Sequence, residues 1–196
     1  MTKSFQTLAA QLAAAAFVLL CACLLTFAID ALTHPYLPAM SAGRISLLYL
    51  PHGVKVLLAW MFGWLSLAAV LPITLIYAVL YLGPENFTWT MAAIVVLKGI
   101  AVPLGFEITK LMGLDLRRCD ESGLRWRQLF IVGFITSVMN QMIRYSMKCC
   151  GTLSVDEQLF SIGSGILADI MGLLAIMVVA MLVFRWLRRT QFQRVY

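Results

Sequence analysis

The stretch from Val54 to Leu82, VKVLLAWMFGWLSLAAVLPITLIYAVLYL, has almost no polar interruption and decides the class of fold. A membrane-spanning helix needs about 20 mostly apolar residues, so this run is too long for one crossing. Gly63 lies inside it and is followed by Trp64, a pair that suits a tight turn at a membrane interface. The stretch therefore predicts two apolar helices that are joined by a turn at Gly63.

The composition of the whole chain supports this interpretation. The 196 residues are 62% hydrophobic and 12% charged, whereas a soluble domain is about half apolar and a quarter charged. The high apolar content also argues against a disordered chain. Five Cys are too few and too irregularly spaced for a disulfide scaffold. We therefore expect a small integral membrane protein.

Extending the search from Val54–Leu82 to both ends of the chain gives six apolar segments of spanning length. They make one all-α transmembrane domain over residues 1–196, a polytopic membrane helix bundle with six transmembrane helices. No cleavable signal peptide is expected. The expected spans are 8–32, 45–62, 65–82, 89–111, 129–147 and 159–186.

The basic residues orient these spans. With six crossings, most basic residues fall on one side, so the positive-inside rule predicts that both termini are cytoplasmic. The net charge of +6 is then a topology signal of a multi-pass protein in a bacterial inner membrane, and no nucleic-acid partner is expected. Arg44 and Lys148 lie on the opposite side. The expected cytoplasmic residues are Lys3, Lys110, Arg117, Arg118, Arg125, Arg127, Arg185, Arg188, Arg189 and Arg194.

Ionisable and amide side chains inside the expected spans are the candidate functional residues. An ionisable group within a membrane span costs several kcal/mol unless it is paired or hydrated. His52 and Lys55 are three residues apart, which predicts that they share one helix face. Ser137 and Lys148 extend a polar stripe on the fifth helix. The candidate ligand-binding residues are His52, Lys55, Lys98, Asn140, Gln141, Arg144 and Asp169.

The predicted orientation brings these residues toward a single cavity that opens to the outside. Lys55, Lys98 and Arg144 supply three positive charges against the carboxylate of Asp169, which acts as an internal counter-ion. Such a cavity favours a small anionic ligand, and an arginine can bind a carboxylate or phosphate in bidentate fashion. In the alternative interpretation, Asp169 pairs with a lysine to hold the bundle together, and the chain is a structural or assembly subunit of a larger membrane complex without a ligand.

Signatures of enzymes and cofactors do not stand out in the sequence. His34 and His52 have no partner at the spacing of metal ligands. We find neither a phosphate-binding glycine loop nor a nucleophile elbow. The sequence therefore predicts a protein that is not an enzyme and needs no metal or cofactor. A binding role in sensing or uptake would then require a partner protein in the membrane.

Two families of membrane proteins resemble parts of this chain. Pro51-His52-Gly53, the apolar run to Gly63 and the segment Ala168–Gly172 (Ala-Asp-Ile-Met-Gly) resemble the MASE1 family of integral membrane sensor domains. That resemblance implies a sensor that works with a signalling partner. The helix at the start of the chain is similar to the partner-binding helix of the substrate-binding subunits of ECF vitamin transporters, which implies uptake of a small molecule. The residues expected at such a partner surface are Ala9, Ala10, Ala13 and Ala14.

Overall fold

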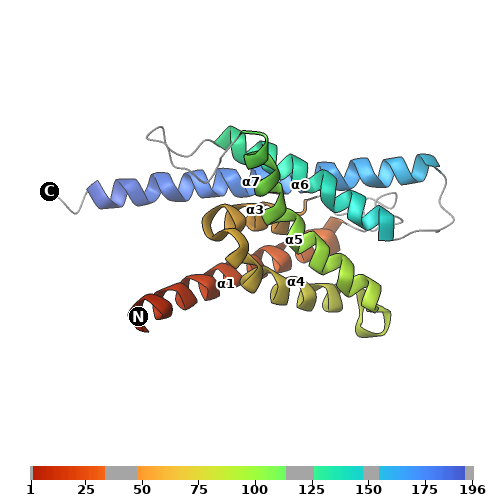
Figure 1. Ribbon diagram of the computed structural model, residues 1–196, viewed down its shortest axis with the longest axis horizontal. Coiled ribbons are helices and arrows are strands. Elements are labelled where there is room, and N and C mark those ends of the chain that lie inside the picture. The colour runs from red at the N-terminus through yellow and green to blue at the C-terminus, as the bar shows by residue number, and fades with distance from the viewer. Residues whose placement is uncertain (1, 34–47, 114–125, 148–154, 193–196) are drawn as a thin grey trace.

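The structure of the chain, a computed structural model, describes residues 2–33, 48–113, 126–147 and 155–192 (Figure 1). Every regular element in these ranges is helical, which confirms the all-α prediction for this part of the chain. The helices are α1 (Thr2–Thr33), α3 (Leu50–Phe62), α4 (Ser66–Leu82), α5 (Trp89–Leu111), α6 (Trp126–Met147) and α7 (Val155–Phe192), with two short 3-10 turns, η1 (Gly63–Leu65) and η2 (Pro84–Asn86).

Four helical segments in the described ranges are long and apolar enough to cross a membrane. Because α3, η1 and α4 follow one another directly, they are counted together as one of these segments. Helix α6 is not among the four, and its sequence is rich in polar side chains. The four segments are Gln6–Thr33, Leu50–Leu82, Trp89–Leu111 and Gln158–Trp186.

The predicted turn at Gly63 is confirmed. Helix α3 ends at Phe62, and Gly63 has a φ angle of +58°, in the left-handed region that favours glycine. The 3-10 turn η1 follows, and α4 begins at Ser66. A glycine inside an apolar run therefore marks the point where the chain reverses.

Helix α3 is shorter than the predicted second span of 45–62. It begins at Leu50, and Leu48 and Tyr49 precede it without helical structure, while residues 45–47 lie outside the described ranges. Pro51 lies in its first turn, where the missing N–H of proline costs no helical hydrogen bond. The 13 residues of α3 extend over about 20 Å, whereas a hydrocarbon core is about 30 Å thick.

Other helices extend beyond the predicted spans. Helix α1 begins before residue 8, α6 begins at Trp126 before residue 129, and α7 continues on both sides of 159–186. The physical reason is that hydropathy reports where the chain is apolar, whereas a helix continues through polar residues wherever its backbone hydrogen bonds persist.

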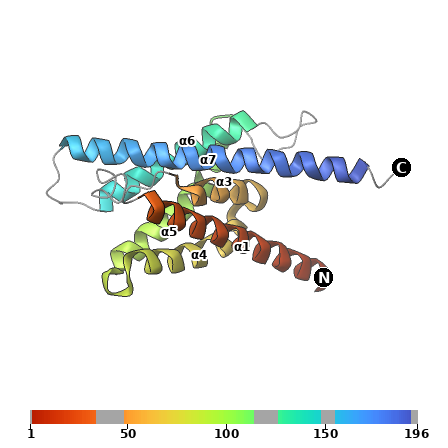
Figure 2. The same ribbon diagram turned by 180° about the vertical axis from the view of Figure 1, so that it is seen from behind.

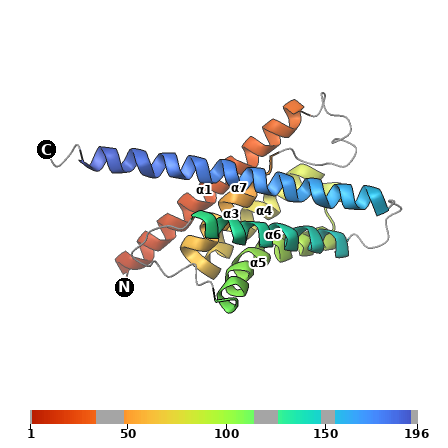
Figure 3. The ribbon, with the colours of Figure 1, turned by 90° about the horizontal axis from the view of Figure 1, so that it is seen from above.

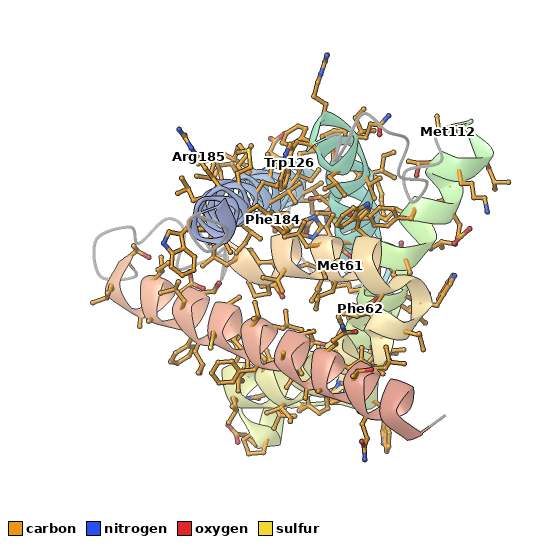
Figure 4. The ribbon with its side chains drawn as sticks, turned by 90° about the vertical axis from the view of Figure 1, so that its left-hand side faces the viewer. Met61, Phe62, Met112, Trp126, Phe184 and Arg185 are labelled. Carbon is orange, nitrogen blue, oxygen red and sulfur yellow. The ribbon has the colours of Figure 1, made fainter. Side chains whose placement is uncertain are left out.

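Helix α3 lies at the centre of the arrangement, between α7 on one side and α1 with α4 on the other (Figures 1 and 2). Its most extensive contact is with α7, and α6 packs between α5 and α7. Helix α1 begins and α7 ends at the same end of the molecule in both views. Figure 4 looks onto this end, and its labels Met61, Trp126 and Arg185 mark the end of α3, the start of α6 and the outer part of α7.

Glycines allow α3 and α7 to approach closely. A Cβ atom at Gly172 on α7 would overlap the carbonyl group of Tyr49, just before α3. A Cβ atom at Gly53 on α3 would lie 2.9 Å from the carbonyl oxygen of Gly172 and 2.9 Å from Leu173 Cα. Small residues at helix contacts are a common means of close packing in membranes. These two glycines therefore set the position of α3 on α7.

Helices α6 and α7 pack antiparallel in a regular register. Gly165 meets Gln141, and one turn further along α7 the carboxylate of Asp169 accepts a hydrogen bond from Ser137. Another turn further, Leu173 fills the space beside Gly133. Because residues four apart lie on one helix face, this register brings the polar face of α6 against α7.

The outer, C-terminal part of α7 extends away from the other helices (Figure 3). Its large apolar side chains are exposed there, in contrast to Leu173, which is fully buried. The exposed residues are Val178, Val179, Met181, Leu182, Val183, Phe184 and Trp186.

Candidate ligand site at the start of α3

The first turn of α3 lies inside the molecule, against the middle of the apolar part of α7. The backbone N–H of Tyr49 donates to the carbonyl oxygen of Ala168 over 3.2 Å. Ala168 is ten residues beyond Gln158, where the apolar segment of α7 begins, a separation of about 15 Å along the helix. No side chain of the N-cap residue caps the start of α3. The backbone N–H groups of Tyr49 and His52 donate to the carbonyl oxygens of Ala168 and Tyr49, and Pro51 has no N–H, so what the start of α3 offers is the positive end of the helix dipole.

His52 in this first turn is almost completely buried, with 1% of its surface exposed. Its Nε2 lies 3.0 Å from the carbonyl oxygen of Gly133 on α6. Because a carbonyl only accepts hydrogen bonds, Nε2 is the donor and carries the hydrogen. The other ring nitrogen, Nδ1, is buried and has no hydrogen-bond partner. One polar atom of the ring is therefore buried inside the protein without a partner.

Asp169 on α7 is the buried carboxylate of this region. Its Oδ2 accepts a hydrogen bond from Ser137 Oγ over 2.9 Å, and both side chains are buried. Asp169 also lies within electrostatic range of His52 and Lys55. The structure thus brings three of the predicted site residues together, with Ser137 as an additional partner.

Lys55 is buried, and its Nζ lies 5.7 Å from the centre of the Tyr49 ring. Cys23 on α1 and Asp169 on α7 both lie within its electrostatic range. Lys55 and His52, predicted to share one helix face, contact different neighbours. Residues three apart on a helix differ by about 60° in direction, so His52 contacts α6 while Lys55 lies over Tyr49 and near α1.

The amide side chains of α6 lie one turn beyond Ser137. Asn140 and Gln141 are both buried, and Asn140 Oδ1 has no hydrogen-bond partner. Gln141 packs against Gly165, where a Cβ atom would come within 2.6 Å of Gln141 Nε2. The amide part of the predicted polar stripe on α6 therefore faces the protein interior.

The two remaining cations lie farther out. Arg144 is half-buried, about one turn beyond Asn140 on α6. Lys98 on α5 is half-buried too, makes an interaction of its own, and places its charge within electrostatic range of His52. Lys148, at the end of the predicted stripe, lies outside the described residues, as do Arg44, Arg117, Arg118, Arg125 and Arg194.

Several residues of this region were not predicted from the sequence. The Gly133 carbonyl is a backbone group, for which sequence gives no signal. Tyr49 lies two residues before Pro51. Because proline is frequent in the first turn of a helix, Pro51 was a sequence signal for the start of α3.

Thr26 on α1 is a further buried polar residue that was not predicted. It is fully buried, and its hydroxyl has no partner. The buried hydroxyl of Thr74, in contrast, donates to the carbonyl of Val70 in its own helix.

The expected partner surface on α1 lies within the described structure. The four alanines of the expected partner surface, Ala9, Ala10, Ala13 and Ala14, are all exposed on α1. The internal contacts of this helix come from another face, which includes Ala15, Leu19 and Cys23. Among the described residues, no group of His, Cys, Asp and Glu side chains could hold a metal ion.

Comparison of the chain with known protein families, with curated proteins and with solved structures finds no match.

Proposed function

We propose that this chain is a multi-pass inner-membrane protein that binds a small anionic ligand at the start of α3, for sensing or uptake with a partner protein. The observation that carries this proposal is the pair of buried, unpartnered polar atoms, His52 Nδ1 and Asn140 Oδ1. Buried polar groups in proteins nearly always have a partner. A ligand that enters the polar cluster of His52, Ser137, Asn140 and Asp169 would supply the missing hydrogen-bond partners.

The charge of the cluster favours an anion. Lys55 is buried there, and the start of α3 adds the positive end of the helix dipole. Membrane transporters use the start of an interrupted helix in the same way, aimed at anionic groups of the substrate. Asp169 offsets part of this charge through its interactions with His52 and Lys55. Arg144, half-buried farther along α6, would receive the ligand from outside.

The proposal includes six crossings with both termini in the cytoplasm. It is supported by the common end at which α1 begins and α7 ends (Figure 1) and by the basic residues of the segment between α5 and α6. Helix α3 would then account for the cytoplasmic part of the second crossing. Its buried start would lie within the bilayer, as irregular backbone does in membrane proteins when protein surrounds it.

The alternative function is a structural or assembly subunit of a larger membrane complex. One observation favours it: Asp169 already has a partner in Ser137 and lies within electrostatic range of Lys55. A carboxylate satisfied in this way holds α6 and α7 together without any ligand. The exposed alanines of α1 would then pack against a neighbouring subunit.

Thermal unfolding of the detergent-purified chain with small carboxylates, phosphates and vitamins separates the two functions. A ligand at a hundred times its Kd stabilises the folded state by about 2.7 kcal/mol. We expect Arg144→Ala to reduce the stabilisation at a fixed ligand concentration. The matched control is Arg127→Ala, an exposed arginine near the start of the same helix, which should leave it unchanged. A folded chain that responds to no compound would favour the structural subunit.

A further inference from the structure

We infer that the ligand is a small monocarboxylate that also carries a hydrogen-bond donor, as in a hydroxy acid such as glycolate or lactate. This inference rests on the proposed function, because it assigns the substrate class of the same site. Its starting point is that two kinds of polar group lie near the start of α3. The buried side chain of Lys55 attracts an anion, and the unpartnered atoms His52 Nδ1 and Asn140 Oδ1 each accept a hydrogen bond.

The accepting character of His52 follows from its contact with α6. Nε2 must donate to the Gly133 carbonyl, so in a neutral ring Nδ1 holds a lone pair and accepts. The ring lies within electrostatic range of two positive groups, Lys55 and Lys98, and of one negative group, Asp169. The unpartnered Nδ1 is thus a buried acceptor that a hydroxyl or amine can satisfy.

Asn140 adds a second acceptor close by. A helix carbonyl points toward the residue four positions on, so the Gly133 oxygen lies near the level of Ser137. Asn140 is about one turn, or about 5 Å, beyond this level. Its Oδ1 is buried without a partner. The ring of His52 therefore meets α6 near the level of Ser137, and Asn140 Oδ1 lies about one turn farther along the same face of that helix.

The anionic part of the ligand has a matching group in the same region. Lys55 is buried there, with its Nζ 5.7 Å from the centre of the Tyr49 ring, and the start of α3 adds the positive end of the helix dipole. The carboxyl group of Asp169 lies there too and accepts the hydrogen bond from Ser137. A singly charged carboxylate is matched by the buried side chain of Lys55, whereas the second charge of a phosphate would need a further buried cation. Charge and hydrogen bonding together define a monocarboxylate with a hydroxyl or amine.

Two pairs of compounds that differ by one hydroxyl group test this inference: glycolate with acetate, and lactate with propionate. Kd values are measured on the full detergent-purified chain by the ligand dependence of thermal unfolding. A site built around buried acceptors discriminates strongly against the analogue without the donor. We expect the hydroxy acid of each pair to bind at least about tenfold more tightly.

The variant His52→Gln links this preference to Nδ1. A glutamine amide can still donate to the Gly133 carbonyl but has no acceptor at the position of Nδ1. Glycolate should then bind about as weakly as acetate, while the affinity for acetate stays within about twofold of wild type. Asn140→Leu, which removes the second acceptor without an added charge, serves as an independent variant if His52→Gln does not fold.

The outcomes separate this inference from the function on which it rests. If wild type binds glycolate and acetate equally, buried water satisfies the acceptors, and the inference fails while anion binding stands. Stabilisation by phosphate but by none of the four carboxylates overturns the inference in the same way. If neither carboxylates nor any other anion of the wider panel stabilise the folded chain, the proposed function fails as well.

Discussion

The two sides of α3 are packed in different ways. Toward α7 and α6, its start is held by close backbone contact at Gly53 and Gly172 and by the hydrogen bond from His52 to Gly133. Toward α1 and α4, it is held by an apolar cluster that includes Leu19, Val54 and other aliphatic side chains. Backbone contact and hydrogen bonds depend on exact position, whereas aliphatic packing adapts. We therefore expect substitutions on the side of α7 and α6 to prevent folding, and substitutions on the side of α1 and α4 to lower the free energy of unfolding by smaller amounts.

Substitution at Gly172, on the side of α7, should destabilise the protein most. In Gly172→Leu, the new side chain would overlap the backbone of Tyr49 and displace α3 from α7. We expect loss of the folded, monodisperse protein in detergent, measured by size-exclusion chromatography and thermal unfolding. Gly163→Leu is the control on the same helix, because nothing lies within 4 Å of a Cβ atom there. Equal behaviour of the two variants would show that α3 does not dock at Gly172.

The apolar side should respond less. Leu19 on α1 is fully buried in the cluster around α3. Leu19→Ala leaves a cavity, and we expect it to lower the free energy of unfolding by about 2 kcal/mol. The variant should remain folded, with a lower unfolding temperature. Leu24→Ala, at a position that is 54% exposed on the same helix, should change that temperature little, and an equal loss in both would argue against this packing.

The hydrogen bond between Ser137 and Asp169 should contribute least to stability. Ser137→Ala removes the donor to Asp169, and hydrogen bonds between membrane helices average about 0.6 kcal/mol. A small decrease in the unfolding temperature is therefore expected. The control is Ser146→Ala, because that hydroxyl is exposed and donates to the Met142 carbonyl within α6. A decrease as large as that of Leu19→Ala would mean that Asp169 carries much of the packing between α6 and α7.

Much of the fold could be predicted from periodicity and hydropathy alone. The helical class and the turn at Gly63 follow from an apolar run that is too long for one crossing. The short length of α3 could not be found in this way, because residues 45–49 are apolar enough to continue a span. Pro51 was the available signal, since a proline in an apolar run often marks the first turn of a helix.

The residues of the candidate site could be predicted from the sequence, but the contacts between them could not. Buried polar residues in spans are few, so His52, Lys55, Asn140, Gln141 and Asp169 could be named from the sequence, and the structure buries all five. Their partners depend on tertiary packing. That His52 contacts the Gly133 carbonyl while Lys55 lies over Tyr49 depends on how far α3 is rotated, which a spacing of three residues does not specify.

The long outer part of α7 has a mechanical consequence. From Gly172, where α3 rests, to Phe192, where α7 ends, the helix extends by about 30 Å. Leu173 and Met177 near Gly172 are buried, whereas the large apolar side chains from Val178 to Trp186 are exposed. A tilt of about 10° at Gly172 would move the tip of α7 by about 5 Å. A rigid α7 would therefore amplify a small tilt beside the candidate site into a displacement of several ångströms at its far end.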